Sequence, residues 1–278
     1  MLSAVKTLLL VFASSLFAQF QTGAASVTFS NAAPIIINDY VTSLAKASPY
    51  PSLINVSGVS GQAVTKVTVS LYGLTHAFPS DINILLTAPN GASCVLMSLV
   101  GGQSGPNVAV TNLLLTLDDN AANSLPVNSR LNSGTFKPTN GYLDPSVAHT
   151  NLPYDLPPSA PAGNSNAPAS LSTFKNIDPT GAWSLFVVDA ASEAAGIISN
   201  GWSLALTTSP PLSIARVSTN ILLSWPASAT NCHLQTSASA TYPTGWSNVL
   251  IAPHVVGQST VVTNPLLPEP RFFKLISN

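Results

Sequence analysis

Apolar and polar side chains alternate repeatedly along the first two thirds of the chain. In the segment 64–72, Val67, Val69 and Leu71 are separated by polar residues. This period of two is typical of a strand with one buried face. Shorter apolar runs bounded by turn residues predict further strands at 82–87, 93–97, 113–117, 183–189 and 202–206. The pattern therefore predicts an all-β fold.

A second series of short strands follows the dipeptide Pro210-Pro211, which indicates a linker. Apolar runs predict strands at 212–216, 221–225, 232–236, 246–250, 260–263 and 271–276. Short strands this close together are typical of a small β-sandwich. We therefore predict a first domain at 26–208 and a smaller second domain at 212–278.

The first domain contains a long segment, about 122–170, that is dense in Pro, Asn and Ser. A connection of this length is uncommon in a compact domain and usually marks a binding loop or an insertion. We expect it to lie as coil over the surface of the sandwich.

The first 25 residues resemble a signal peptide. Lys6 precedes a twelve-residue run from Thr7 to Ala18 that is rich in apolar side chains, which suits a signal sequence better than a membrane span. Cleavage after Ala18 or Ala25 is compatible with the small residues there; the alternative is an N-terminal membrane anchor. No later segment has the length of a transmembrane helix, so we expect a secreted protein, extracellular or at the cell surface.

The composition narrows the function classes further. Only 7% of the 278 residues are charged, and 9 basic against 10 acidic residues give a formal charge of -1. A nucleic-acid-binding protein would carry a basic patch, and a polybasic membrane-surface protein would carry basic clusters. We therefore expect neither nucleic acid nor an anionic membrane surface as a partner.

Residues that could carry catalysis or hold a structural metal are sparse. The two cysteines, Cys94 and Cys232, allow at most one disulfide, and we expect two buried thiols in preference to a bridge. The chain has no Gly-x-Ser-x-Gly elbow and none of the catalytic motifs of a subtilisin-like protease. The sequence therefore predicts no catalytic site.

Four acidic residues at predicted strand ends stand out in this nearly uncharged chain. Carboxylates on loops, together with amide and backbone oxygens, are the ligands that Ca²⁺ prefers. The alternative is that each carboxylate caps a turn by accepting backbone N–H groups. The candidate calcium ligands are Asp81, Asp118, Asp119 and Asp189.

Several motifs resemble the P domain (P/Homo B) of the subtilisin-like proprotein convertases. They are His-Ala-Phe-Pro-Ser-Asp-Ile-Asn-Ile-Leu-Leu at 76–86, Leu-Asp-Asp-Asn-Ala at 117–121, Gly-Thr-Phe-Lys-Pro at 134–138, and Gly-Ala-Trp-Ser-Leu-Phe-Val-Val-Asp at 181–189 with Trp-Ser-Leu at 202–204. The resemblance implies a jelly-roll β-sandwich that stabilises a protease or acts as an extracellular accessory module. It also implies that Trp183 and Trp202 are core residues, and that the four acids are candidate calcium ligands.

The second domain resembles the short fibronectin-type-III-like modules of exported proteins. The resemblance rests on Ile-Leu-Leu-Ser-Trp-Pro at 221–226, Trp-Ser-Asn-Val at 246–249 and Arg-Phe-Phe-Lys-Leu at 271–275. The alternative is an unrelated small sandwich.

Two interpretations of function follow. The first is a non-catalytic secreted accessory or binding module whose partner is an extracellular protein or a glycan. Phe136, Tyr142 and Tyr154 are candidate binding residues, unless they only fasten the long segment to the sandwich. The second is a component of a subtilisin-like protease system that stabilises a separately encoded catalytic chain, or a hydrolase with an unrecognised site.

Overall fold

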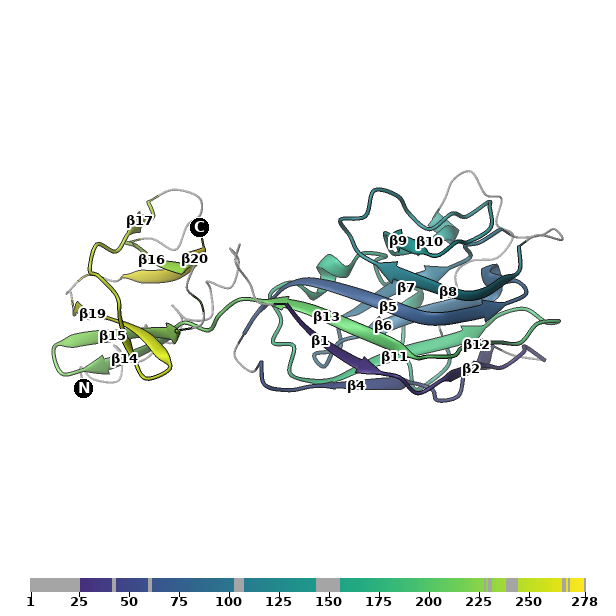
Figure 1. Ribbon diagram of the computed structural model, residues 1–278, viewed down its shortest axis with the longest axis horizontal. Helices are drawn as coiled ribbons and strands as arrows, with labels where there is room; N and C mark the ends of the chain where they lie inside the picture. Colours follow the sequence, from purple (N-terminus) through teal and green to yellow (C-terminus); the bar gives the residue numbers. More distant parts are fainter. Residues whose placement is uncertain are drawn as a thin grey trace. The chain divides into compact units, whose positions relative to one another are not determined.

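The computed structural model divides the chain into two compact units (Figure 1). The larger unit comprises Val27–Ser60 and Lys66–Leu206, and the smaller comprises mainly Thr207–Asn278. The linker predicted at Pro210-Pro211 begins three residues after Thr207, where the smaller unit starts. The structure describes residues 26–41, 44–59, 62–102, 108–143, 156–227, 229, 232–238, 245–266, 269 and 271–277. The predicted signal peptide lies outside these residues.

The first sheet of the larger unit is built around the long strand β5. On one edge, β5 pairs with β8, and β8 pairs in parallel with β9. On the other edge, β5 pairs with both β12 and β13. β12 in turn pairs with β2, and β13 with β1. The strands are β1 (Ser26–Asn31), β2 (Ile35–Ile37), β5 (Val64–His76), β8 (Val110–Leu117), β9 (Gly134–Phe136), β12 (Gly196–Ile198) and β13 (Trp202–Thr208).

The second sheet is centred on β6 and β11. β7 pairs with the free edge of β6, β10 extends β7 in parallel, and β3 and β4 pair with different parts of β11. The strands are β3 (Ala45–Lys46), β4 (Ser52–Val56), β6 (Ile82–Thr87), β7 (Ser93–Ser98), β10 (Thr139–Asn140) and β11 (Gly181–Asp189).

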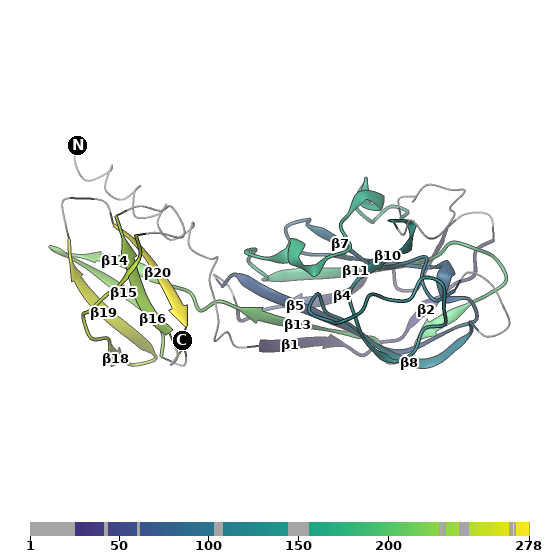
Figure 2. The same cartoon turned by 90° about the horizontal axis from the view of Figure 1, so that it is seen from above.

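The two sheets pack face to face as a β-sandwich, which confirms the predicted all-β class (Figure 2). Trp183 on β11 and Trp202 on β13 are both fully buried, as expected. Each indole nitrogen donates a hydrogen bond: Trp183 to the Pro179 carbonyl at 2.9 Å, and Trp202 to the Ser52 hydroxyl at 3.0 Å. The second bond joins strands of opposite sheets, so the aromatic core and its polar contacts hold the layers together.

Residues 156–170 cover the outer face of the second sheet. Leu156 packs with Leu85, Val95, Phe186 and Val188, all buried. This cover explains why every residue of β6 is buried, whereas the half-covered β4 alternates between buried and exposed residues. The described part of the segment therefore lies over the sandwich, as the sequence predicts.

Within the described residues, the helical elements are short 3-10 turns, as the strand-rich pattern predicts. They are η1 (Pro79–Asp81), η2 (Gly141–Leu143), η3 (Asn164–Asn166) and η4 (Leu171–Phe174). None of the described helices has the length and apolar character needed to cross a membrane. Cys94 is buried, Cys232 is half-buried, and both thiols are free.

The smaller unit has two antiparallel sheets and its own core. One sheet has the order β14-β15-β19-β18 and the other β17-β16-β20. The strands are β14 (Ser213–Val217), β15 (Asn220–Pro226), β16 (Cys232–Ser237), β17 (Ser247–Asn248), β18 (His254–Val256), β19 (Ser259–Pro265) and β20 (Phe272–Ser277). Both sheets contribute to the core, which contains Ile221, Leu223, Trp225, Leu234, Val262, Phe273 and Leu275.

Candidate functional site

A buried histidine–aspartate pair links the two sheets of the larger unit. His76 ends β5 and Asp189 ends β11, and the two side chains are fully buried. Nε2 of His76 lies 3.1 Å from Oδ2 of Asp189. Nδ1 of His76 accepts the backbone N–H of Phe78 at 3.1 Å, so the ring proton lies on Nε2 and is donated to Asp189.

This arrangement leaves His76 without a free nitrogen. A catalytic histidine needs one ring nitrogen for its orienting carboxylate and the other for the nucleophile. Here a backbone amide takes the second position, and Oδ1 of Asp189 accepts the N–H of Ala191 at 2.9 Å. The pair therefore has the geometry of a structural cross-link between the sheets.

Asp81 lies close to this pair and is half-buried. The pKa of Asp81 is raised from about 3.8 to about 6, mainly by burial and also by the neighbouring Asp189 carboxylate, against the opposing effect of a hydrogen bond from Ser80. That bond, from Oγ of Ser80 to Oδ1 of Asp81, measures 3.2 Å. Asp81 therefore changes charge in mildly acidic solution.

We expect the Asp81 carboxyl to make the unfolding free energy fall as the pH rises from about 4 to about 6. The folded state holds this proton more tightly than the unfolded chain, so its stabilising contribution is complete below the unfolded pKa and is lost as the pH passes through the folded pKa. Because Asp81 is partly exposed, the loss should be about 1 kcal/mol after allowance for solvent screening. Urea unfolding from pH 4 to pH 7 measures it. Asp81→Asn lacks this carboxyl and is the control; equal pH slopes for both proteins would contradict the assignment.

The adjacent pair Asp118 and Asp119 is held by other partners. Oδ2 of Asp118 lies 2.7 Å from Nζ of Lys66, and its Oδ1 accepts the N–H of Asn120 at 2.9 Å. Burial raises the pKa of Asp118, but the bonds from Lys66 and Asn120 outweigh this and lower it overall.

Asp119 caps the start of η4. Its carboxylate accepts the N–H groups of Leu171 and Ser172 at 2.9 and 2.8 Å and the hydroxyl of Ser170 at 2.8 Å. Asp118, Asp119 and Asp189 thus each accept a backbone N–H near a turn, which is the alternative that the sequence left open for these acids.

The four candidate calcium ligands fall into two places. Asp118 binds Lys66 near the start of β5, whereas Asp189 binds His76 at its end. Ten residues of strand separate these two partners, which corresponds to about 30 Å. Among the described residues, no group of three or more His, Cys, Asp or Glu side chains is arranged to hold a metal ion. Calcium binding stays a prediction, and the four acids do not share one ion.

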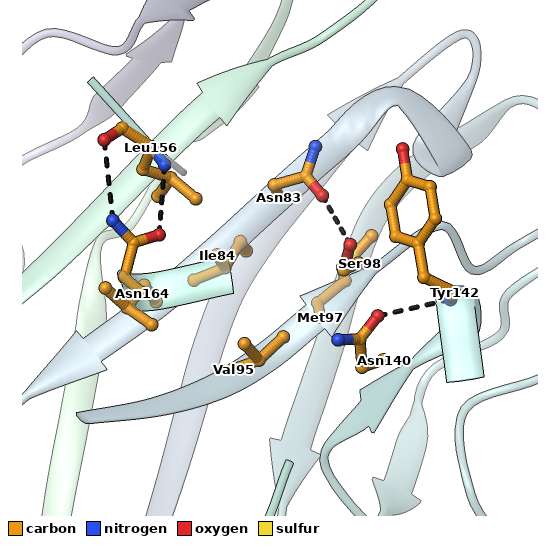
Figure 3. A pocket seen from close by; sticks show the side chains of 10 residues that line it. Asn83, Ile84, Val95, Met97, Ser98, Asn140, Tyr142, Leu156 and Asn164 are labelled. Atoms are coloured by element: carbon orange, nitrogen blue, oxygen red, sulfur yellow. Dashed lines mark hydrogen bonds between the residues drawn. The ribbon is translucent and has the colours of Figure 1, made fainter. Parts of the chain in front are cut away.

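A small hollow opens on the second sheet, between η2 and η3 (Figure 3). Its volume is about 20 Å³, which is room for roughly one water molecule. Its polar lining consists of Asn83, Ser98, Asn140, Tyr142 and Asn164. Its apolar lining consists of Ile84, Leu85, Val95, Met97 and Leu156.

The polar side chains of the hollow are positioned by local hydrogen bonds. Oγ of Ser98 donates to Oδ1 of Asn83, and Oδ1 of Asn140 accepts the N–H of Tyr142 at 3.1 Å (Figure 3). Asn164 accepts the N–H of Leu156 through Oδ1 at 3.0 Å and donates to the Leu156 carbonyl at 3.4 Å. The hollow is therefore built from three separate stretches of chain.

No protein-family model matches this chain, and a search of the curated proteins finds no match for it. The resemblances to the P domain and to a fibronectin-type-III-like module rest on their motifs alone and stay predictions.

The candidate aromatic residues are not brought together among the described residues. Tyr142 lines the hollow, whereas Phe136 is half-buried on β9, where its backbone carbonyl accepts the N–H of Asp118 at 2.8 Å. Tyr154 lies outside the described residues. Sequence reasoning missed Ser98, Asn140 and Asn164 as site residues. The one available signal was Asn83, an amide within the apolar run 82–86.

Proposed function

We propose that this chain is a secreted, non-catalytic accessory or binding module whose larger unit is a P-domain-like jelly roll. Its partner is an extracellular protein or a glycan. The predicted signal peptide, the low charge and the motif resemblance support this proposal.

The order of the strands supports the jelly-roll assignment. We number the strand positions as β1 with β2, β3 with β4, β5, β6, β7, β8, β11, and β12 with β13. One sheet then has the order first–eighth–third–sixth and the other second–seventh–fourth–fifth. Successive positions thus alternate between the two sheets, except that the fourth and fifth are neighbours in the second sheet, as in the double Greek key of a jelly roll; the short parallel strands β9 and β10 stand outside this numbering.

The non-catalytic assignment rests on His76, because both of its ring nitrogens already have hydrogen-bond partners. His76 is the histidine of the motif that resembles the P domain. It is paired with the buried Asp189, as a histidine is paired with an Asp in a catalytic triad. Its remaining nitrogen accepts the N–H of Phe78, and the residue is only 1% exposed. Substrate therefore has no access to this imidazole as a general base.

We expect no covalent labelling of the intact secreted chain by a fluorophosphonate probe, because no serine is activated by His76. Labelling followed by mass spectrometry measures this, with an active subtilisin-like protease as the positive control. Stoichiometric labelling of one serine, abolished when that serine is replaced by alanine, would overturn the non-catalytic assignment.

We propose the Asp81 end of the sandwich as the place where calcium binds. Asp118 and Asp119 already accept hydrogen bonds from Lys66 and from η4, so they fit poorly as metal ligands. Asp189 likewise accepts hydrogen bonds from His76 and Ala191, but its carboxylate is close enough to Asp81 to raise the pKa of Asp81, and a cation beside Asp81 would relieve this repulsion.

Calcium at a hundredfold excess over its dissociation constant is expected to raise the melting temperature by about 5–10 °C relative to EDTA. Binding to the folded state alone contributes about 2.7 kcal/mol at that excess, and about 2–4 °C follows from each kcal/mol in a domain of this size. Thermal unfolding of the wild type, Asp81→Asn and Asp119→Asn provides the measurement. The shift should disappear in Asp81→Asn and persist in Asp119→Asn; an unchanged melting temperature in the wild type would exclude the calcium site.

A further inference from the structure

We propose that Asn90, at the tip of the hairpin between β6 and β7, is a site of spontaneous deamidation that converts the chain into a more acidic form. Water is the only co-reactant, so the change needs neither an enzyme nor a partner, and the site is separate from the binding function proposed above. The fold decides which of the three Asn-Gly dipeptides of the chain reacts. They are Asn90-Gly91, Asn140-Gly141 and Asn200-Gly201.

The reaction joins two groups of the same dipeptide. The backbone nitrogen of the glycine loses its proton and attacks Cγ of the asparagine side chain, the bond between Cγ and Nδ2 breaks, and ammonia leaves. Water then opens the resulting five-membered succinimide at either carbonyl, which gives aspartate or isoaspartate with no oxidation or reduction. Glycine favours ring closure, because it has no Cβ to obstruct the attack and its backbone reaches more conformations.

Asn90 has the exposure, the room and the polarised side chain that this reaction requires. Asn90 and Gly91 are both exposed, and a Cβ on Gly91 would meet nothing within 4 Å, so the backbone can rearrange there. Oδ1 of Asn90 accepts the N–H of Ala92 at 3.1 Å, which stabilises the negative charge that develops on this oxygen during the attack. The N–H of Gly91 donates to the Ala88 carbonyl at 2.9 Å, so this one bond at the hairpin tip has to open first.

Asn140-Gly141 is enclosed by the fold. Asn140 lies on β10 and is 7% exposed, and its Oδ1 accepts the N–H of Tyr142 at 3.1 Å. Gly141 is buried, and a Cβ there would lie 2.2 Å from the carbonyl oxygen of Leu99. The backbone therefore has no room to turn toward the side chain, and the reaction has to wait for local unfolding.

Asn200-Gly201 is exposed at the asparagine but is fixed to β5 through its backbone. The N–H of Asn200 donates to the Tyr72 carbonyl at 3.0 Å, and the carbonyl of Gly201 accepts the N–H of Tyr72 at 3.0 Å. Gly201 is buried, and a Cβ there would lie 1.9 Å from the carbonyl oxygen of Asn31. Ring closure here requires this turn to separate from β1 and β5, which is a larger opening than that of a hairpin tip.

Deamidation of Asn90 changes the charge of the molecule more than its stability. The chain has 9 basic and 10 acidic residues, so one further carboxylate changes the formal charge from -1 to -2. Asn90 and Gly91 are exposed, so the product loses no buried contact. The acidic form should therefore stay folded and be separable from the original chain by ion exchange.

The test incubates the full secreted chain at pH 7 and at pH 9, folded and in concentrated urea. Peptide mapping by mass spectrometry measures the conversion of each Asn-Gly dipeptide, and methyl transfer by an isoaspartyl methyltransferase detects isoaspartate. The key variant is Asn90→Gln, which keeps an amide but would have to close a six-membered ring. The dipeptides at Asn140 and Asn200 are the matched controls within the same chain.

In the folded chain, conversion at Asn90 is expected to be at least about tenfold faster than at Asn140 or Asn200, because only those two wait for a larger opening. It should be faster at pH 9, since the glycine nitrogen must lose its proton. In urea the three rates should approach one another, and Asn90→Gln should not form the acidic species. Conversion at Asn90 no faster than at Asn140, a ratio that urea leaves unchanged, or an acidic species that persists in Asn90→Gln would each overturn the proposal.

Discussion

Replacement of Gly201 by alanine is expected to destabilise the larger unit by at least about 3 kcal/mol, because it combines backbone strain with a steric clash. Gly201 has φ +66°, a left-handed conformation that costs other residues roughly 1–2 kcal/mol. A Cβ at this position would also lie 1.9 Å from the carbonyl oxygen of Asn31 and 2.9 Å from that of Ala33. Both contacts are with backbone, so relief of the clash requires β1 to separate from the turn before β13.

Gly91 provides the matched control for Gly201. It also has a positive φ, +87°, but a Cβ there meets nothing within 4 Å. Gly91→Ala should therefore cost only the conformational penalty, about 1–2 kcal/mol. Urea unfolding of both variants separates the two effects, and similar losses in Gly201→Ala and Gly91→Ala would show that the close approach of β1 is not as described.

Truncation of Trp183 to alanine is expected to cost about 3–5 kcal/mol of unfolding free energy. The indole is fully buried and packs edge-on against Phe174, with ring centroids 5.0 Å apart. Its removal leaves a large cavity between β11 and η4, and leaves the Pro179 carbonyl without the hydrogen bond that it accepts from the indole. Intrinsic fluorescence and circular dichroism followed through urea unfolding provide the measurement.

Trp183→Phe separates packing from hydrogen bonding at the same position. The phenyl ring keeps much of the contact with Phe174 but cannot donate to Pro179, so the expected cost is smaller than that of Trp183→Ala and includes about 1–3 kcal/mol for the buried carbonyl. Equal losses for the two variants would show that ring packing contributes little and that the indole N–H accounts for the effect.

The longer strands were predictable from their patterns. A strand buried on one face alternates apolar and polar residues, and a strand buried on both faces is continuously apolar. The run 82–87 forms β6 over the same residues, and the alternating segment 64–72 forms the first part of β5, which continues to His76. The strands β1 to β4 were not predicted. They are short edge strands, and segments of two to six residues carry too few positions for a period to be recognised.

The partners of the candidate site residues could not be predicted, since they come from distant parts of the chain. His76 and Asp189 are 113 residues apart, and Asp119 meets Ser172 across 53. The sequence singled out the carboxylates as rare charges, but spacing alone did not show which of them would pair with Lys66 and which with histidine. The hollow could not be predicted either, because Asn83, Asn140 and Asn164 lie far apart in the sequence and only the fold brings them together.

By itself the sequence determined the all-β class and the positions of the longer strands, because local periodicity depends on near neighbours along the chain, and the P-domain resemblance implied the burial of Trp183 and Trp202. The tertiary structure alone decided that the acids separate into two places along β5, that both nitrogens of His76 are occupied, and that Asn83, Asn140 and Asn164 line one hollow. These features depend on which strands of the two sheets lie opposite each other, and that arrangement follows from the packing of the whole sandwich.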